Sequence, residues 1–426
     1  MRGRYIAGID VGSTKVCAAV ARVDSRGMEI IASGTVPSSG LRKGVVVDMD
    51  ETANSINMAV KEAESVSGID IKSAYIGISG AHIKSAESYG ATGIKGKEVK
   101  AKDIERVIDA ASAVYVPLDR EILHVLPSEF VIDGQDGIAR PYGMAGVRLE
   151  VKVQVLTASQ AVLENLDRAL SRTGLKVTEM VFQPLASALA VLKDEEMEQG
   201  ALLVDMGGGT TDLALLKGGA LRFTSVIPVG SQHITNDLAL GMKLPQKEAE
   251  RLKKRYGTAG GEKGNLFSDE KIEAVNMSGK TKSFDHDEIE KIIKLRCEET
   301  FELVKNSAEA AILKHEPVCV VLTGGGSQMR DITEMAERWL GLPVRMGVPE
   351  RVKNSIVRDV VREPQYSTAV GLLLYALQAE GGEKGSSGPL PVLQDSLGAI
   401  KDTILGQGWA SVKKMVSRIR RPEPGV

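Results

Sequence analysis

Two aspartates, roughly half a chain apart, each follow an apolar stretch and precede a glycine-containing turn. Asp10 lies in the segment GIDVGSTK and Asp205 in the segment LLVDMGGGTTD. A strand that ends in aspartate and turns through glycines brings backbone N–H groups close to an anion, while the carboxylate can hold a cation. A polyphosphate that carries magnesium needs this combination of amides, hydroxyls and carboxylates. The pair therefore predicts a duplicated phosphate-binding site.

The residues around the two aspartates supply the predicted contacts. Asp10 and Asp205 would hold Mg²⁺ through water. The predicted phosphate contacts are Gly12, Ser13, Thr14, Lys15, Gly207, Gly208, Gly209, Thr210 and Thr211. A third loop follows the apolar stretch 318–323 and precedes a helix expected over 328–340; its predicted contacts to a flat base are Gly324, Gly325, Gly326 and Ser327. One such loop alone is usually only a turn, but three in this order favour a single nucleotide site.

The three loops resemble the two phosphate loops and the adenosine loop of actin, DnaK-type chaperones and sugar kinases. Segments 182–190 and 366–373 resemble the two connecting helices of that fold, and the helical stretch 249–253 resembles its ribose and adenine contacts, here Glu250 and Lys253. The resemblance implies a two-lobed, actin-like (ribonuclease H-like) α/β ATPase fold that binds ATP with Mg²⁺.

Within that fold, the chain most resembles the FtsA family of bacterial cell-division proteins. The resemblance covers about residues 4–379, and its supporting segments are LHVLP at 123–127, GIARP at 137–141, GVRL at 146–149, GLKV at 174–177 and VIP at 226–228. It implies an ATP-binding protein that polymerises, tethers the FtsZ ring through the FtsZ C-terminal tail and recruits later division proteins. The implied location is the cytoplasmic face of the inner membrane, at the septum.

At 426 residues the chain exceeds the usual limit for one hydrophobic core, so two lobes with subdomains are expected. The mixed composition of residues 82–159 indicates an inserted subdomain, and by resemblance it is the relocated one that distinguishes the FtsA family. The other expected parts are a first lobe (1–81, 160–198 and 362–379), a second lobe (199–233 and 302–361), its smaller subdomain (234–301), a flexible linker (380–400) and a terminal helix (401–421).

The C-terminal segment has the pattern of an amphipathic helix behind a flexible tether. The segment EGGEKGSSGP, from residue 380, is small, polar and of low complexity. On a helical projection, one arc carries Trp409, Val412, Met415, Val416 and Ile419, and the rest carries Lys413, Lys414, Arg418, Arg420 and Arg421. Such a helix lies in the interface of an anionic bilayer. The alternative is a helix that docks on the protein's own core or in a calmodulin-like groove.

Charge and cysteine content exclude several other classes. The formal net charge of -2 gives no general attraction to nucleic acid, and we expect no nucleic-acid partner. The cysteines Cys17, Cys297 and Cys319 form no CxxC pair, so neither a disulfide framework nor a structural zinc site is indicated. A reducing cytoplasm fits this pattern.

Hydrolysis of ATP would need a group that orients a water molecule against the γ-phosphate. Gln183 stands before Pro184 at the start of the first connecting helix, where actin-like ATPases carry a Gln or Glu for this purpose; a helix-capping or solvent-facing amide is the alternative role. We expect slow hydrolysis at most. A pilus-assembly ATPase like PilM remains the first alternative, and a small-molecule kinase of the same fold is weaker because no catalytic aspartate stands out.

Overall fold

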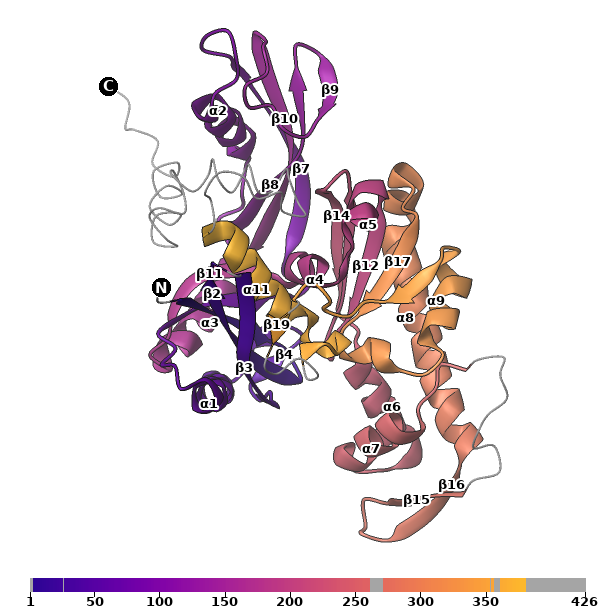
Figure 1. Cartoon of the computed structure of the whole chain (residues 1–426). Helices are drawn as coiled ribbons and strands as arrows, with labels where there is room; N and C mark the ends of the chain where they lie inside the picture. The colour runs from indigo at the N-terminus through magenta and orange to yellow at the C-terminus, as the bar shows by residue number, and fades with distance from the viewer. Residues whose placement is uncertain (1–2, 26, 261–270, 353, 356–360, 381–426) are drawn as a thin grey trace.

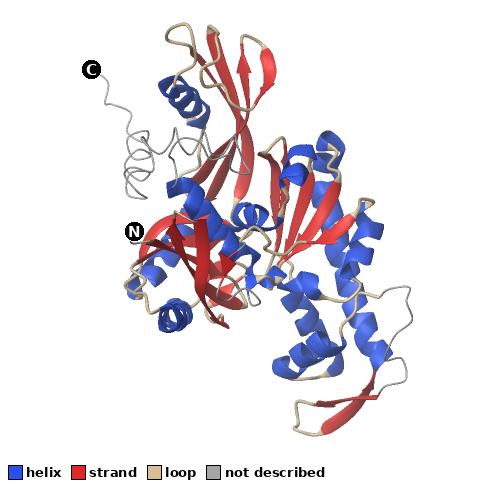
Figure 2. Cartoon of the chain, viewed as in Figure 1, coloured by secondary structure: helices blue, strands red, loops and turns tan. Residues whose placement is uncertain are grey.

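We describe residues 3–25, 27–260, 271–352, 354–355 and 361–380 of a computed structural model. They form two lobes, each built on a central sheet, with an inserted subdomain that projects from the first lobe (Figure 1). Helices cover the outer faces of the sheets, and sheet and helix alternate along most of the chain (Figure 2). The two-lobed α/β architecture predicted from the sequence is confirmed. The linker and terminal helix predicted at 380–421 lie outside the described residues from 381 onward.

The first lobe contains a six-stranded sheet in the order β11-β6-β1-β2-β3-β19. Its strands are β1 (Arg4–Val11), β2 (Lys15–Asp24), β3 (Gly27–Pro37), β6 (Ser73–Ile78), β11 (Lys176–Phe182) and β19 (Asn354–Ser355). Its helices are α1 (Met49–Ser67), α3 (Gln160–Arg172), α4 (Gln183–Val191) and α11 (Ser367–Glu380), and a short pair β4 (Leu41–Arg42) and β5 (Val45–Val46) precedes α1. The Asp48 side chain caps α1, and Gly68 ends it with φ +69°.

The inserted subdomain has its own sheet and core. Its elements are β7 (Lys84–Gly93), α2 (Ala101–Ser112), β8 (Arg120–Ile132), β9 (Gln135–Ile138) and β10 (Arg148–Ser159), and the strand order is β7-β10-β8-β9. Apolar residues of α2, including Val107, pack against inward residues of the strands, such as Phe130 and Val153. Gly90 lets β7 approach α2 closely, because a Cβ there would overlap the Val107 carbonyl oxygen.

The second lobe contains a five-stranded sheet in the order β14-β13-β12-β17-β18. Its strands are β12 (Ala201–Met206), β13 (Thr211–Lys217), β14 (Ala220–Ile227), β17 (Cys319–Thr323) and β18 (Val344–Met346). The helices are α5 (Asp194–Gln199), α6 (Ser231–Met242), α7 (Gln246–Tyr256), α8 (His286–His315) and α9 (Ile332–Leu340), and the hairpin of β15 (Lys271–Val275) and β16 (Thr281–Asp285) leads into α8.

The two central sheets repeat one arrangement. β1 pairs antiparallel with β2 and parallel with β6, just as β12 pairs antiparallel with β13 and parallel with β17. Asp10 therefore stands near the end of β1 as Asp205 does near the end of β12. The duplication predicted from the two aspartates is thus present in the strand pairing.

Helices α4 and α11 cross between the lobes at backbone contact. A Cβ at Gly371 of α11 would overlap the carbonyl oxygen of Ala186 in α4. The largest buried cluster includes both helices together with Leu203, Ala214 and Leu216 of the second-lobe sheet. The crossing therefore joins the two lobes in one continuous core.

The turn between β13 and β14 is tight, since Gly218 and Gly219 both have positive φ, at 62° and 65°. The helix expected over 328–340 starts later, because Asp331 has φ +59° and α9 begins only at Ile332. A short 3-10 helix, Gly325–Gln328, occupies the preceding turn. Among the described helices, none is long and apolar enough to cross a membrane.

Candidate functional site

The three predicted loops meet at one cavity of about 920 Å³ between the lobes. Its wall includes most residues that the sequence predicts for nucleotide binding, namely Asp10, Gly12, Ser13, Thr14, Lys15, Gln183, Asp205, Gly207, Gly208, Gly209, Thr210, Glu250, Lys253, Gly324, Gly325 and Gly326. These residues come from segments more than 300 positions apart in the chain. The topology therefore assembles a single polar cavity from the two phosphate loops, the third loop and α7.

Two predicted contacts, Thr211 and Ser327, are not part of the cavity wall. Both are fully buried, and their hydroxyls donate to backbone oxygens instead: Thr211 to Val229 at 2.8 Å and Ser327 to Gly324 at 2.8 Å. Both hydroxyls fix the shape of the loops rather than extend into the cavity.

The two phosphate loops touch each other across the cavity floor. A Cβ at Gly208 would overlap the side chain of Thr14, and a Cβ at Gly209 would lie 2.6 Å from Oγ of Ser13. Oγ of Ser13 also accepts a hydrogen bond from the Gly44 N–H at 3.1 Å. Glycine is thus required where the loops approach, and this approach brings amides of both lobes to the same place.

Asp10 is held by two side chains. Nζ of Lys15 lies 3.2 Å from Oδ2 of Asp10, and Nε2 of Gln183 donates to Oδ1 at 2.9 Å. Burial lowers the pKa of Lys15, but the Asp10 carboxylate, together with Cys17 and Tyr366, outweighs burial, so the net shift is upward. Lys15 therefore stays charged and faces the space where a phosphate would lie.

Asp205 is buried and fixed from behind. Oγ of Ser187, in α4, donates to its Oδ2 at 2.6 Å, and the same hydroxyl lies 3.0 Å from Oγ1 of Thr368 in α11. Gly324, with φ +83°, packs against the Asp205 carboxylate, where any Cβ would overlap it. Burial raises the pKa of Asp205 to about 6, and the nearby Asp10 carboxylate adds to the rise.

Asp212 is a site residue that the sequence prediction missed. It pairs with Asp205 in the β12–β13 register and lines the cavity. Burial raises its pKa to about 7, with a further contribution from the Asp205 carboxylate. Its place at the end of the segment DMGGGTTD could have indicated it. Three carboxylates, from Asp10, Asp205 and Asp212, thus line one polar cavity. A divalent cation would relieve the electrostatic repulsion among them.

The far end of the cavity carries the predicted base and ribose contacts. Nζ of Lys253 lies 2.7 Å from Oε2 of Glu250 and donates to Oγ1 of Thr235 at 2.9 Å. Burial lowers the pKa of Lys253, and although burial raises that of Glu250, the Lys253 ammonium outweighs it, so the Glu250 pKa falls. The pair is therefore ionic. Further wall residues that the sequence prediction did not include are Ser231, Gln232, Arg255, Met329 and Gln365.

The predicted membrane contacts cannot be placed in this geometry. All ten residues, from Trp409 to Arg421, lie outside the described part of the chain.

Family models match the second lobe, the start of α11 and the insert. The family model "Cell division protein FtsA" matches residues 202–371, and the model "SHS2 domain inserted in FTSA" matches residues 80–157. The second range coincides with the inserted subdomain of β7 to β10.

Whole-length relatives agree. The cell division protein FtsA of Pseudomonas aeruginosa is 42% identical over 382 residues, which cover 89% of this chain and 90% of the relative. FtsA of Escherichia coli K12 is 35% identical over 386 residues, covering 88% and 91%.

Solved structures share the fold at lower identity. The PilM-PilN type IV pilus biogenesis complex gives a TM-score of 0.63 at 18% identity, covering 87% of this chain and 98% of that chain. MreB5 of Spiroplasma citri bound to ADP gives 0.52 at 15% identity, covering 87% and 96%. These likenesses establish an actin-like fold. The identities above 30% over nearly nine tenths of the chain go further, and the chain belongs to the FtsA family of cell-division proteins.

Proposed function

We propose that this cell-division protein binds ATP with Mg²⁺, polymerises on the cytoplasmic face of the inner membrane and tethers the FtsZ ring there at the septum. The observation that carries the nucleotide part is the convergence of three glycine loops and three carboxylates on one interlobe cavity. The similarity to cell division proteins of other bacteria supports the division role.

The residues present fit a magnesium nucleotide. Asp10, Asp205 and Asp212 would hold the metal through its water ligands, because Mg²⁺ keeps several waters and takes few carboxylates directly. The amides of the two phosphate loops and the Lys15 ammonium would bind the phosphates. The metal would neutralise charge on the phosphate oxygens. Glu250 and Lys253 would contact the ribose and the base at the other end of the cavity.

Hydrolysis is proposed to be slow. Gln183 lines the cavity and is bonded to Asp10, so its amide is close enough to the phosphate loops to orient a water molecule. Among the described cavity residues, no histidine accompanies it as a general base. Nucleotide turnover would then regulate assembly more than it would supply a product.

Attachment to the membrane would come from the C-terminal helix. The basic and apolar arcs of residues 409–421 suit an anionic bilayer surface. The FtsZ tail would bind the smaller subdomain of the second lobe, where α8 offers residues 288–305, and the insert would contact the next protomer and later division proteins. A PilM-like role is disfavoured, because the solved PilM-PilN complex is 18% identical whereas the FtsA relatives are 35–42% identical.

Co-sedimentation on liposomes tests the tether. Purified FtsZ is mixed with anionic liposomes and ATP, together with either the full chain or the chain truncated after Ala379. The proposal expects FtsZ in the pellet only with the full chain. Equal recruitment by the truncated chain would refute the assignment of the tail, and membrane binding of the full chain without FtsZ would refute the assignment of the partner.

A further inference from the structure

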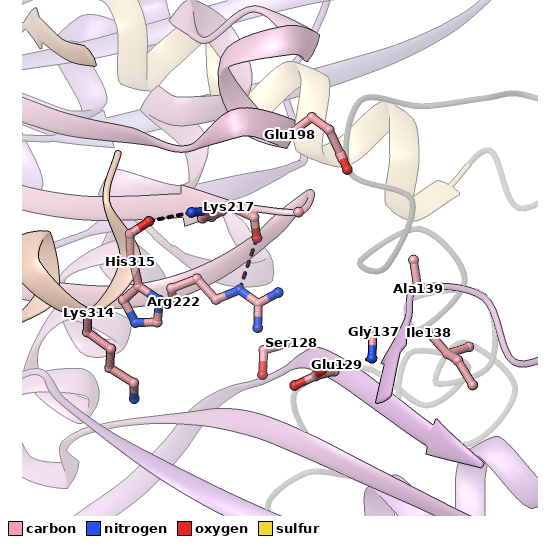
Figure 3. A pocket seen from close by; sticks show the side chains of 11 residues that line it. Ser128, Glu129, Gly137, Ile138, Ala139, Glu198, Lys217, Arg222, Lys314 and His315 are labelled. Atoms are coloured by element: carbon pink, nitrogen blue, oxygen red, sulfur yellow. Dashed lines mark hydrogen bonds between the residues drawn. The ribbon is translucent and has the colours of Figure 1, made fainter. Parts of the chain in front are cut away.

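A second cavity, of about 430 Å³, lies where the insert meets the second lobe (Figure 3). One wall comes from Ser128 and Glu129 of β8 and from Gly137 of β9. The opposite wall comes from the β13–β14 turn with Lys217 and Arg222, and from the C-terminal end of α8. The volume falls in the range of small-molecule sites. No residue of this wall belongs to the nucleotide cavity.

Arg222 is held in place by one of its N–H groups, which leaves the others available. Its Nε donates to the Lys217 carbonyl oxygen at 3.0 Å. Among the described residues, neither Nη group has a hydrogen-bond partner, and in Figure 3 the guanidinium points toward Ser128 of the insert. Gly218 leaves room for it, since a Cβ there would lie 3.2 Å from Nη2. A fixed guanidinium with free Nη groups is the geometry that binds an oxyanion through two parallel hydrogen bonds.

Most carboxylates nearby are already engaged. Glu129 accepts hydrogen bonds from Nζ of Lys152 at 2.8 Å and from the Gly137 N–H at 2.9 Å. Although burial raises the pKa of Glu129, these bonds, together with the charges of Lys152 and Arg222, lower it overall. Glu87, beyond the cavity edge, lies 3.2 Å from Nζ of Lys314. The remaining carboxylate of the wall, Glu198, forms no ion pair with any described residue.

A second basic side chain of the wall, Lys217, is anchored at the end of α8. Nζ of Lys217 donates to the His315 carbonyl oxygen at 2.7 Å, at the end of α8. An ammonium group has three donors, so two remain for a ligand. Burial lowers the pKa of His315, and the neighbouring Lys314, Arg222 and Lys217 lower it further. The imidazole is therefore neutral near pH 7, and the positive charge of the cavity resides on its lysines and Arg222.

We propose that this cavity binds a small oxyanion, the phosphate or carboxylate group of a small molecule, with Arg222 as the bidentate donor and Lys217 as the second cation. The insert and the second lobe already touch beside this cavity, because Nε2 of Gln154 in β10 donates to the Arg222 carbonyl oxygen at 3.2 Å. A ligand between them fastens the insert to the second lobe. The proposal is independent of nucleotide binding in the first cavity.

Calorimetric titration of the full chain tests the site, with inorganic phosphate and succinate as separate probes. A non-hydrolysable ATP analogue and Mg²⁺ are kept in excess, so that probe binding in the nucleotide cavity is suppressed. We expect saturable binding of at least one probe, which Arg222→Gln weakens by about tenfold or more. Arg168→Gln, the same change on the exposed surface of α3, should have no effect. Binding of phosphate alone assigns a phosphate ligand, and binding of succinate alone assigns a carboxylate.

Glu198→Gln provides a test of opposite sign that does not remove a cation. Loss of this carboxylate should tighten probe binding by about two- to threefold, since it removes repulsion at the cavity wall. Circular dichroism checks that each variant is folded. The proposal is overturned if the unmodified chain binds neither probe, or if folded Arg222→Gln binds as tightly as the unmodified chain. Should Arg222→Gln fail to fold, an unchanged affinity in Glu198→Gln overturns it.

Discussion

Nε2 of Gln183 donates to Oδ1 of Asp10 at 2.9 Å, so the first residue of α4 is bonded to the end of β1. The same amide donates to the Gly77 carbonyl oxygen at 3.3 Å. Two bonds to the first lobe fix the amide beside the phosphate loops. A substitution of this amide can therefore test whether it acts in ATP hydrolysis or in ATP binding.

Gln183→Ala should slow ATP hydrolysis by about tenfold or more and change ATP affinity by less than about threefold, because water positioning acts in the transition state. Single-turnover phosphate release measures the first quantity, and nucleotide titration the second. Gln160→Ala, an amide that bonds Glu164 on α3, is the matched control. Unaltered turnover in Gln183→Ala would leave this amide with a structural role only.

Asp205→Ala should weaken ATP binding by about tenfold or more when Mg²⁺ is present, because a carboxylate facing the metal is lost. In EDTA the variant and the unmodified protein should bind ATP with similar affinity. Fluorescent-nucleotide titrations under both conditions measure the difference. An equal loss with and without metal would mean that Asp205 acts on the shape of the loop, and unchanged affinity would contradict the site assignment.

Glu179 should make stability depend on pH. Burial raises its pKa to about 7, against the opposing hydrogen bond from the Tyr375 hydroxyl at 2.7 Å. Between about pH 4.5 and pH 7, Glu179 carries a proton in the folded state but not in the unfolded state. The stability that this carboxyl contributes is therefore fully present below about pH 4.5 and is lost as the pH rises through 7.

Glu179→Gln removes this dependence. The variant should be more stable than the unmodified protein at pH 8, by about 1–3 kcal/mol, and the difference should shrink toward pH 5. Urea unfolding at several pH values measures it, with Glu302→Gln, an exposed change on α8, as control. If the free energy of unfolding depended on pH in the same way for Glu179→Gln and for the unmodified protein, this carboxyl would not titrate in that range.

Gly371→Ala should destabilise the protein by about 1–3 kcal/mol or more, because the new methyl group overlaps the Ala186 carbonyl oxygen where α4 and α11 cross. Gly93→Ala is the control, since a Cβ there meets nothing within 4 Å. Thermal unfolding of both variants gives the comparison. Equal midpoints would mean that the two helices separate at little cost.

Trp409→Glu should release the protein from anionic liposomes, with a several-fold fall in the bound fraction, because a charge replaces the aromatic anchor of the apolar arc. Ser417→Glu adds the same charge among the basic residues of the helical projection and should reduce binding less. Flotation with vesicles measures both. Retention of Trp409→Glu on the vesicles would place the attachment elsewhere in the chain.

Local sequence patterns predict the two glycine turns that follow Asp10 and Asp205 and line the interlobe cavity, because the aspartate, the strand before it and the glycines after it are adjacent in sequence. The late start of α9 was not predictable in this way. Asp331 adopts a left-handed conformation, and its carboxylate accepts a hydrogen bond from Thr258, a residue more than seventy positions away. Such a contact depends on tertiary structure and has no local pattern.

The cavity wall also contains both features that a local sequence pattern predicts and features that depend on strand pairing. Asp212 was within a recognised segment, yet only the β12–β13 register reveals that it faces Asp205. Conversely, Thr211 fits the motif but is buried toward Val229. Strand alternation decides which of two neighbouring polar residues lines the cavity, and the motif alone does not give the strand register.

The glycine crossing of α4 and α11 restricts how the molecule can move. Two helices in backbone contact cannot slide past each other without collision, so the lobes can turn about this point but not translate. Displacement in such a rotation grows with distance from the axis. The insert and the β15–β16 hairpin, at opposite extremes of the molecule in Figure 1, would sweep the widest arcs. A small change of angle at the nucleotide cavity would then be amplified into a large step at the surfaces farthest from it.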